Sequence, residues 1–395
     1  MKLRFRKYTV LLLLIVAGLK TELTAALPVN VRIFTTNIIS TFIFSPAEGS
    51  YSIYGDGVFL MDCDATGIFQ IGIEKDSIHL KTFENDIGNY ATIKFVSKPE
   101  HAAFKIKCVF PLSLVRTYDD DLEVRLMPDK TQLLLINKVG LESYIAGVVQ
   151  SESGKTNNRE YYKMQAILCR TYLLANLNRH ITEGFQVCDD VHCQVYLSRA
   201  TENKVKDAVL TTQGLVIVDS DLNLITAAFH SNCGGETCNS EDVWAISTTY
   251  LKAVKDTFCI HKTNAYWERS IPLIDWQVYL KSKGKKENDS FSKPFNTNNF
   301  NQQSGRAIYY VDGSFKLPLK TIRADFKLKS TYFSVTPKGN NIVFKGRGYG
   351  HGVGLCQEGA MQMSKSNYTY IDILHHYYKG IIVVDLTSLN YFKQE

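Results

Sequence analysis

The chain has 395 residues, which is enough for two domains or for one large core with insertions. Hydrophobic residues make up 45% of it and charged residues 21%, as in ordinary globular proteins, and its 22 tyrosines and 21 phenylalanines suit a strand-rich fold and sugar-binding surfaces. The formal net charge of +6 is small for this length and is not gathered into a basic patch, which argues against nucleic-acid binding.

Residues 1–26 have the layout of a secretory signal peptide. Four basic residues in MKLRFRK precede an apolar run of about twelve residues, YTVLLLLIVAGL, and small residues follow at Ala25 and Ala26. An uncleaved membrane anchor is the alternative, but the run is short for a span, and no later segment reaches about eighteen uninterrupted apolar residues. We therefore expect cleavage near Ala26 and an exported protein of the periplasm or cell envelope, without a membrane span after cleavage.

Residues 27–130 are typical of a β-rich region. Short strand-like runs such as VRIFTTN, YSIYGDGVFLMD and AAFKIKCVFPL are separated or interrupted by turn residues at 46–49 and 55–57. One more strand is expected at Thr131–Val139, where a second region, residues 131–390, begins.

Helical periodicity follows this strand. In Gly140–Ser153 apolar residues recur with the three- and four-residue spacing of one helix face, at Leu141, Tyr144, Ile145, Val148 and Val149. A second helix is expected from about Arg159 to His180. The second region is therefore predicted to begin with two helices.

The remainder of residues 131–390 mixes strands and helices around a polar insertion. Residues 281–305 are rich in Asn and Lys and have no period, which predicts a mobile surface loop. Strands resume after it, and the last helix is predicted to begin at Thr369, with Asp372 completing a capping box, and to end near Gly380. The predicted class is α+β, with an N-terminal β-rich region and a mixed helix and strand catalytic core whose C-terminal part is strand-rich.

Glu152 falls on the apolar face of the first predicted helix, about 20° from Leu141 at about 100° per residue. Burial there disfavours the carboxylate, and so does the negative end of the helix dipole, because Glu152 lies in the last turn. Both effects raise the pKa, as a general acid requires near neutral pH. The alternative is a glutamate at a fraying helix end that reaches into water.

A group of metal-capable residues lies in QVCDDVHCQVY, residues 186–196. Cys188, His192 and Cys193 fall within six residues, and the next cysteine along the chain is Cys233, in HSNCGGETC. Thiolate sulfurs and an imidazole nitrogen are the ligands of structural zinc sites. These four residues are therefore a candidate zinc site.

Disulfides are the alternative for the same cysteines. An exported protein can form Cys188–Cys193 or Cys233–Cys238, and the odd total of nine cysteines leaves at least one unpaired. Cys169 and Cys356 lie in apolar stretches and are expected to be simple buried thiols.

The stretch GRGYGHGVGLCQEGA, residues 346–360, has glycine at every second position from 346 to 354. It lacks the ending of a phosphate-binding loop, and its period of two would place all the glycines on one face of an extended chain. We expect that bare face to contact a helix, a strand or a ligand, because dense glycine is entropically unfavourable. The opposite face would carry Arg347, Tyr349, His351, Val353 and Leu355, and the alternative is tight packing with these residues merely exposed.

Six motifs occur in the order in which they occur in the SpoIID/LytB family, which the chain therefore resembles. They are YIAGVVQSESG, YKMQAILCRTYLLAN, DDVHCQVY, HSNCGGETCNSEDVW followed by YLKAVKD, FKLKSTYFSV, and GRGYGHGVGLCQEGAMQMS. The resemblance covers about Val29 to Gly380. The chain departs from the family at Ser153–Gly154, where a proline is usual, and in its extra cysteines Cys233, Cys238 and Cys259.

The resemblance implies an exported peptidoglycan lytic transglycosylase that cleaves the MurNAc–GlcNAc linkage of glycan strands stripped of stem peptides. The essential acid of the family is the glutamate of a GVVxxE motif, here Glu152. Members with a Cys/His cluster near HCQVY can carry zinc. Our candidates for substrate binding are Arg170, Gln194, Tyr196, Ser231, Tyr349, His351 and Gln357, and for Arg170 a structural ion pair is an equal alternative.

A competing interpretation is a non-catalytic peptidoglycan-binding protein that recruits or stimulates a cell-wall amidase. The long β-rich region and the aromatic residues would serve that function equally well. A zinc hydrolase is disfavoured, because a cysteine-rich metal site is usually closed and structural.

Overall fold

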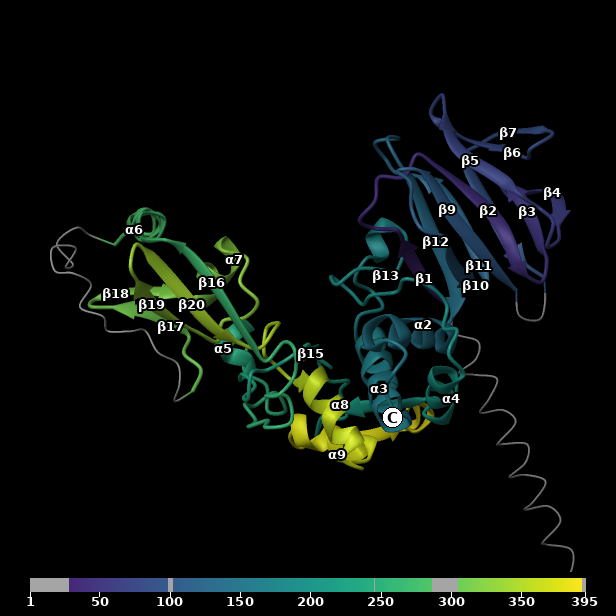
Figure 1. The fold of residues 1–395 in the computed structure, drawn as a ribbon. Helices are drawn as coiled ribbons and strands as arrows, with labels where there is room; N and C mark the ends of the chain where they lie inside the picture. The colour runs from purple at the N-terminus through teal and green to yellow at the C-terminus, as the bar shows by residue number, and fades with distance from the viewer. Residues whose placement is uncertain (1–27, 99–101, 245, 286–304, 393–395) are drawn as a thin grey trace, which may run out of the picture. The chain divides into compact units, whose positions relative to one another are not determined.

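The computed structural model describes residues 28–98, 102–244, 246–285 and 305–392. The predicted signal peptide and most of the predicted loop at 281–305 lie outside the described residues. Among the described residues, the strands β1 to β12 follow one another without a helix between them, and helices and further strands come after them, which confirms the predicted α+β class (Figure 1).

The chain divides into two compact units. Unit 1 comprises residues 1–216 and 384–395, and unit 2 comprises residues 217–383, so that unit 2 is an insertion in the sequence of unit 1. The division falls within β14 (Leu215–Val218) and β22 (Ile382–Asp385). The sequence analysis placed a boundary at residue 130 instead. That residue lies between β11 and β12, which pair from Asp121–Lys138 to Leu126–Leu133, so both strands belong to one sheet.

Unit 1 begins with two sheets (Figure 1). One has seven strands in the order β13-β1-β12-β11-β8-β3-β4, and the other has six in the order β10-β9-β2-β5-β6-β7. The strands are β1 (Pro28–Ile33), β2 (Thr41–Glu48), β3 (Tyr51–Gly55), β4 (Val58–Cys63), β5 (Phe69–Glu74), β6 (Ser77–Lys81), β7 (Asp86–Tyr90), β8 (Thr92–Ser97), β9 (Ala103–Phe110), β10 (Arg116–Asp119), β11 (Asp121–Leu126), β12 (Leu133–Gly140) and β13 (Val187–Cys188).

Aromatic side chains fill the space between these sheets. In β2 every second residue is buried, as expected for strands with one face toward a core. The ring of Phe44 stacks on Phe95 of the other sheet at 3.8 Å between centroids, and on Phe104 at 5.5 Å. The strand-like runs predicted in the N-terminal region thus form a packed β-sandwich.

Four helices follow the sandwich in unit 1: α2 (Leu141–Ser153), α3 (Arg159–Ala175), α4 (Asn203–Thr211) and α10 (Leu386–Phe392). All five apolar residues that predicted the first helix are buried in α2. The second predicted helix is confirmed as α3, although it ends five residues early, before the single-turn 3-10 helix Ile181–Glu183. Within the described residues, we find no helix with both the length and the apolar character needed to cross a bilayer.

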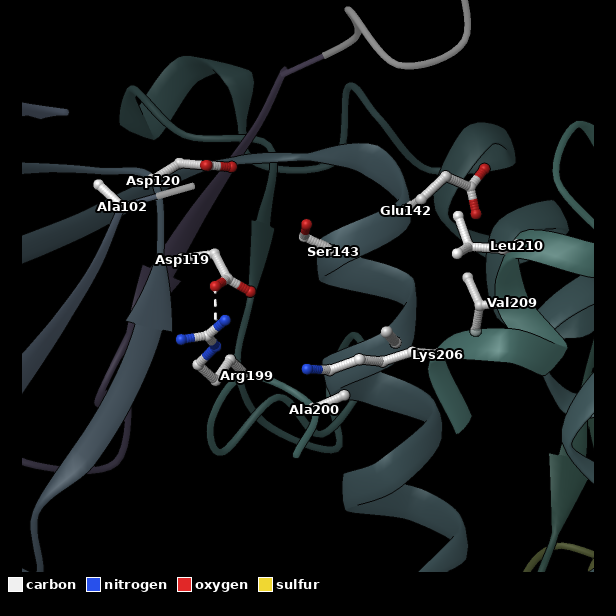
Figure 2. A pocket seen from close by; sticks show the side chains of 11 residues that line it. Ala102, Asp119, Asp120, Glu142, Ser143, Arg199, Ala200, Lys206, Val209 and Leu210 are labelled. Carbon is white, nitrogen blue, oxygen red and sulfur yellow. Dashed lines mark ion pairs between the residues drawn. The ribbon is translucent and has the colours of Figure 1, made fainter. Parts of the chain in front are cut away.

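A cavity of about 280 Å³ lies beside the first turns of α2 (Figure 2). Its polar lining includes Glu142 at the start of that helix and an ion pair of 2.9 Å between Arg199 and Asp119. Figure 2 shows Lys206 extending into the same space. Glu152 is not among the lining residues, so this cavity and the predicted acid belong to opposite ends of α2.

Unit 2 is built from shorter elements. Its strands are β15 (Phe229–His230), β16 (Tyr266–Pro272), β17 (Tyr309–Asp312), β18 (Phe315–Pro318), β19 (Phe333–Lys338), β20 (Asn341–Arg347) and β21 (Leu355–Cys356). Its helices are α5 (Ser240–Trp244), α6 (Leu273–Ser282), α7 (Leu319–Asp325), α8 (Gln357–Lys365) and α9 (Tyr370–Tyr377). The predicted capping box at the start of α9 is confirmed, because Thr369 and Asp372 each bond the main chain of the other.

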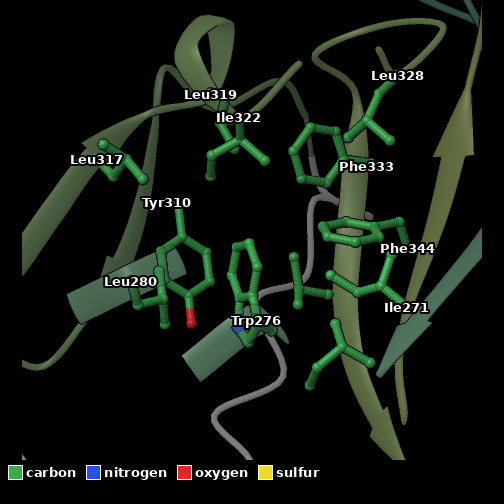
Figure 3. Packing of buried hydrophobic residues seen from close by; sticks show 12 residues of the cluster. Ile271, Trp276, Leu280, Tyr310, Leu317, Leu319, Ile322, Leu328, Phe333 and Phe344 are labelled. Carbon is green, nitrogen blue, oxygen red and sulfur yellow. The ribbon is translucent and has the colours of Figure 1, made fainter. Parts of the chain in front are cut away.

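The core of one part of unit 2 surrounds Trp276 of α6 (Figure 3). Its indole is fully buried and meets the rings of Tyr310 and Phe344 edge to face, at 5.5 and 5.4 Å between centroids. Phe344 belongs to the central strand of the sheet β16-β20-β19. This core therefore holds α6 and the β17–β18 hairpin against that sheet.

The extended glycine face predicted for residues 346–360 is wrong beyond β20. Gly348, Gly350, Gly352 and Gly354 have φ values of 74°, 116°, 85° and 70°, in the left-handed region that only glycine enters without strain. A Cβ atom at Gly348 would lie 2.5 Å from the oxygen of Asn232, and one at Gly354 would lie 2.2 Å from the oxygen of Ala228. The glycines thus serve a run of tight bends, and the expected close backbone contact is confirmed.

Gly354→Ala should destabilise the protein more than Gly380→Ala. Both residues have positive φ, 70° and 62°, but a Cβ at Gly380 meets nothing within 4 Å. The left-handed backbone disfavours alanine by about 1–2 kcal/mol at either site, and the overlap with Ala228 adds about 1–3 kcal/mol at Gly354. Urea unfolding of both proteins measures the difference, and equal losses of stability would contradict the contact.

Candidate functional site

Glu152 is the next-to-last residue of α2, at the end of the helix where the sequence placed it. Its carboxylate oxygen Oε1 accepts a hydrogen bond of 3.0 Å from the main-chain N–H of Val195. Burial raises the pKa of Glu152, and the hydrogen bond from Val195 opposes this in part. The predicted direction of the shift is confirmed, so this carboxyl group keeps its proton to a higher pH than a surface glutamate does.

The last turn of α2 is held by main-chain donors from the loop 195–202. Besides Val195, the N–H of Leu197 donates to the hydroxyl of Ser151 at 3.1 Å. The N–H groups of Thr201 and Glu202 donate to the side-chain oxygen of Gln150 at 2.8 and 3.0 Å. Three consecutive helix residues are thus fixed by one loop, and the position of the Glu152 carboxyl depends on the path of that loop.

Tyr196 fixes this loop and does not face a substrate. Its side chain is fully buried, its hydroxyl donates to Asn137 at 3.1 Å, and its ring lies 5.0 Å from that of Tyr144. A Cβ on Gly147 of α2 would lie 2.4 Å from the Tyr196 ring, so the glycine allows the ring to rest on the helix. The predicted substrate contact at Tyr196 is therefore corrected to a structural one.

Arg170 also has a structural role. It is fully buried in α3, and its Nε and Nη2 atoms donate to the two carboxylate oxygens of Glu142 at 3.0 and 2.5 Å. Its Nη1 atom donates to the main-chain oxygen of Leu215 at 3.1 Å. The structure therefore shows the ion-pair alternative, with Arg170 joining α3 to the start of α2, and not a contact with Glu152.

Gln194 directly precedes Val195 and is only 2% exposed. In the part of the chain that the structure describes, neither its amide oxygen nor its amide nitrogen has a hydrogen-bond partner. A buried amide normally finds partners, and this one also interacts with the neighbouring Cys169 thiol, so only part of its donor and acceptor capacity is left for a ligand. Gln194 remains a candidate for substrate binding.

Two histidines and two cysteines of unit 1 meet beside this loop. His180, Cys188, His192 and Cys193 each offer one ligand atom, and these atoms all lie within 4.8 Å of one another. The sequence analysis missed His180, because it lies eight positions before Cys188 and reads as the end of a helix. It also included Cys233, which is wrong, since Cys233 belongs to a different group of residues in unit 2.

The four residues fit zinc. The Cys193 sulfur lies 3.5 Å from Nε2 of His180 and 3.8 Å from Nδ1 of His192, and the Cys188 sulfur lies 3.9 Å from the latter atom. Tetrahedral zinc would hold such atoms about 3.3–3.8 Å apart. Nδ1 of His180 lies 2.5 Å from a carboxylate oxygen of Glu183, the kind of partner that orients a histidine ligand.

The other predicted substrate residues lie in unit 2, and His351 has a role different from the predicted one. Its Nε2 atom lies 3.0 Å from the oxygen of Phe229, and its Nδ1 atom is 3.1 Å from the N–H of Val353. Burial lowers the pKa of His351 to about 4, so the ring is neutral, donates to Phe229 and accepts from Val353. Both ring nitrogens bond the main chain, so His351 stabilises the backbone of the glycine bends.

The surroundings of Tyr349 and Gln357 leave both side chains able to contact a ligand. The Tyr349 side chain is 46% exposed, and the ammonium group of Lys329 lies 5.6 Å from its ring centroid. Nε2 of Gln357 has no partner among the described residues. The hydroxyl of Ser231 accepts a long hydrogen bond of 3.4 Å from Asn264 and is half-buried.

The fold and the site define an α+β protein with a partly buried glutamate in the last turn of a helix and a Cys/His group beside the adjoining loop. A family model described as stage II sporulation protein matches residues 129–218, which include Glu152, Arg170 and the Cys/His group. Stage II sporulation protein D of Bacillus subtilis is 31% identical over 261 residues, which cover 62% of this chain and 74% of that protein. The chain belongs to the SpoIID/LytB family.

Two further relatives extend the comparison. A protein of Brachyspira hyodysenteriae is 26% identical over 317 residues, covering 78% of this chain and 80% of that protein. The amidase enhancer of Bacillus subtilis is 27% identical over 287 residues, which are 60% of this chain and 39% of that protein. Similarity to stage II sporulation protein D and to the Brachyspira protein therefore spans most of this chain and most of each of those relatives.

Proposed function

We propose that the protein is an exported peptidoglycan lytic transglycosylase that cleaves the MurNAc–GlcNAc linkage, preferably in strands stripped of stem peptides. One observation carries the proposal: Glu152, in the last turn of α2, is a partly buried carboxyl with a raised pKa, and a main-chain N–H fixes its position. Relatives named for sporulation and for amidase enhancement support a role in the cell wall.

The proposed reaction uses Glu152 twice. The protonated carboxyl donates to the glycosidic oxygen while the bond from that oxygen to C1 of MurNAc breaks, and positive charge develops at C1. The carboxylate then takes the proton of the C6 hydroxyl as that oxygen bonds to C1. The products are a 1,6-anhydroMurNAc end and a GlcNAc with a free 4-hydroxyl, and no water is consumed.

The surroundings of Glu152 suit both steps. Burial favours the protonated form from which the reaction begins. The N–H of Val195 then stabilises the carboxylate that exists between the two proton transfers. Gln194, next to Val195, is our candidate for a hydrogen bond to a sugar acetamido or hydroxyl group.

We also propose that His180, Cys188, His192 and Cys193 hold a structural zinc ion. Four protein ligands would close the site, so the metal would supply folding free energy and no catalysis. Because the same loop carries Val195, the four ligands would stabilise the path that positions Glu152. The metal content of purified His180→Ala protein tests this site, because that protein should hold one zinc ion fewer than the wild type.

Product analysis tests the proposed reaction. Purified glycan strands, with and without stem peptides, are digested in ¹⁸O-labelled water, and the ends are identified by mass spectrometry. We expect anhydroMurNAc ends without ¹⁸O, mostly from stripped strands. Reducing ends carrying ¹⁸O would show a hydrolase, and intact strands together with faster cleavage by an added cell-wall amidase would favour the binding-protein alternative.

A further inference from the structure

A second group of metal-capable side chains lies in unit 2, and none of its members takes part in the proposed function. Cys233, Asp256, Cys259 and Cys356 are all fully buried, and one ligand atom from each lies within 4.8 Å of the others. We propose that these four residues bind one Zn²⁺ ion in a closed structural site.

The four ligands come from three segments that are distant in sequence. Cys233 follows β15, Asp256 and Cys259 lie in the loop before β16, and Cys356 ends β21. The Cys233 sulfur lies 3.3 Å from the Cys259 sulfur and 3.3 Å from Oδ2 of Asp256. Asp256 and Cys259 have the two-residue separation of a zinc half-site, and thiolates with one carboxylate are a donor set that zinc accepts.

Neighbouring groups direct hydrogen-bond donors at the proposed ligands. The main-chain N–H groups of Cys233 and Gly359 point at the Cys356 sulfur, with distances of 3.2 and 3.4 Å. The hydroxyl of Tyr377 donates to Oδ2 of Asp256 at 2.8 Å. Donors in this arrangement stabilise thiolate and carboxylate ligands and orient them.

Gly359 allows this close arrangement. A Cβ atom there would lie 2.3 Å from Oδ2 of Asp256 and 2.2 Å from the Tyr377 hydroxyl oxygen. Glycine in a helix interior is unfavourable by about 0.5–1 kcal/mol relative to alanine, so its presence in α8 needs a packing reason. The approach of Asp256 and Tyr377 to the helix supplies that reason.

The charge of the group also points to a cation. The donors to Asp256 are the Tyr377 hydroxyl, cysteine thiols and the main-chain N–H of Phe258, all uncharged. Burial lowers the pKa of the nearby His376, which disfavours a positive charge on that ring as well. A buried carboxylate without a compensating positive charge is strongly unfavourable. Zinc binding would release the protons of the three thiols and leave a metal held by four anionic ligands. The Arg306 guanidinium is bonded to the main-chain oxygen of Cys233, which places a positive charge next to this group.

Metal analysis of purified full-length protein and three variants tests the site. We expect two zinc ions per chain in the wild type, and one in either Cys259→Ala or His180→Ala. Cys238→Ala is the matched control, because Cys238 is another buried cysteine of unit 2 outside the group and should leave both ions. In cobalt-substituted proteins, sulfur-to-cobalt absorption should weaken more in Cys259→Ala, which removes a three-thiolate site, than in His180→Ala.

A second measurement covers the case in which Cys259→Ala does not fold. Wild-type protein is titrated with a mercurial thiol reagent, and released zinc is followed while peptide mapping identifies the modified cysteines. One zinc ion should leave in step with modification of Cys233, Cys259 and Cys356. Modification of these residues without zinc release, or a Cys233–Cys259 disulfide in the untreated protein, would overturn the proposal.

Discussion

Replacing Glu152 with glutamine should abolish glycan cleavage and leave the fold intact. Glutamine keeps the side-chain oxygen that accepts from Val195 and removes only the acidic proton. General acid–base catalysis contributes about 10²–10⁴-fold, so we expect anhydroMurNAc formation to fall by at least that factor while the melting temperature changes by a few degrees at most. The measurement pairs product analysis with thermal unfolding.

A matched variant and the pH dependence make this test specific. Glu160→Gln changes a glutamate that lies 2.7 Å from Lys163 on α3 and should keep full activity. The first step needs protonated Glu152, so wild-type activity should fall as pH rises through its raised pKa. The protonated carboxyl also stabilises the fold, and this contribution should be lost as the pH rises through the same pKa. The glutamine protein has no carboxyl at this position and should not show this loss of stability. If the Glu152→Gln protein kept full activity, a group other than Glu152 would have to donate the proton to the glycosidic oxygen.

Arg170→Met should cause a large loss of stability. The substitution leaves the Glu142 carboxylate, which is 12% exposed, without its bidentate partner, and it removes the donor to the oxygen of Leu215. Removing one member of a buried ion pair costs about 3–5 kcal/mol. Urea unfolding measures the loss, and adding Glu142→Gln to the same protein should restore part of it, because the double variant carries no unpaired charge.

Arg159→Met is the control for this prediction. Arg159 begins the same helix but is exposed, with one hydrogen bond of 2.9 Å to Thr211, so its loss should change stability by about 0.5 kcal/mol or less. A stable Arg170→Met protein that no longer cleaves glycan would contradict the ion-pair assignment. It would instead support the substrate contact considered from the sequence.

Local periodicity is what made α2 and Glu152 predictable. A helix needs only the spacing of its own apolar residues to be recognised, and that spacing also placed Glu152, which is partly buried, in the last turn of the helix. The capping box at Thr369 is local in the same way. Such features were confirmed almost to the residue.

Features that depend on contacts between distant segments were not predictable. The burial of Arg170 and Tyr196 depends on Glu142 and Asn137, which lie 28 and 59 positions away. Cys356 reads as a simple buried thiol, and only the fold brings it to Cys233, which is 123 positions away. A glycine at every second position fits an extended strand and a run of left-handed bends equally well, because periodicity does not report the sign of φ.

The insertion of unit 2 within the sequence of unit 1 has a consequence for biosynthesis. The last segment of unit 1 contacts an early one through a hydrogen bond of 2.8 Å from Leu386 to the oxygen of Gly214. At translation rates of about 5–20 residues per second, the ribosome releases all of unit 2 before that segment emerges. Unit 1, which holds Glu152, is therefore begun before unit 2 and completed after it, so the acid-bearing unit gains all its contacts only once the whole of unit 2 has been synthesised.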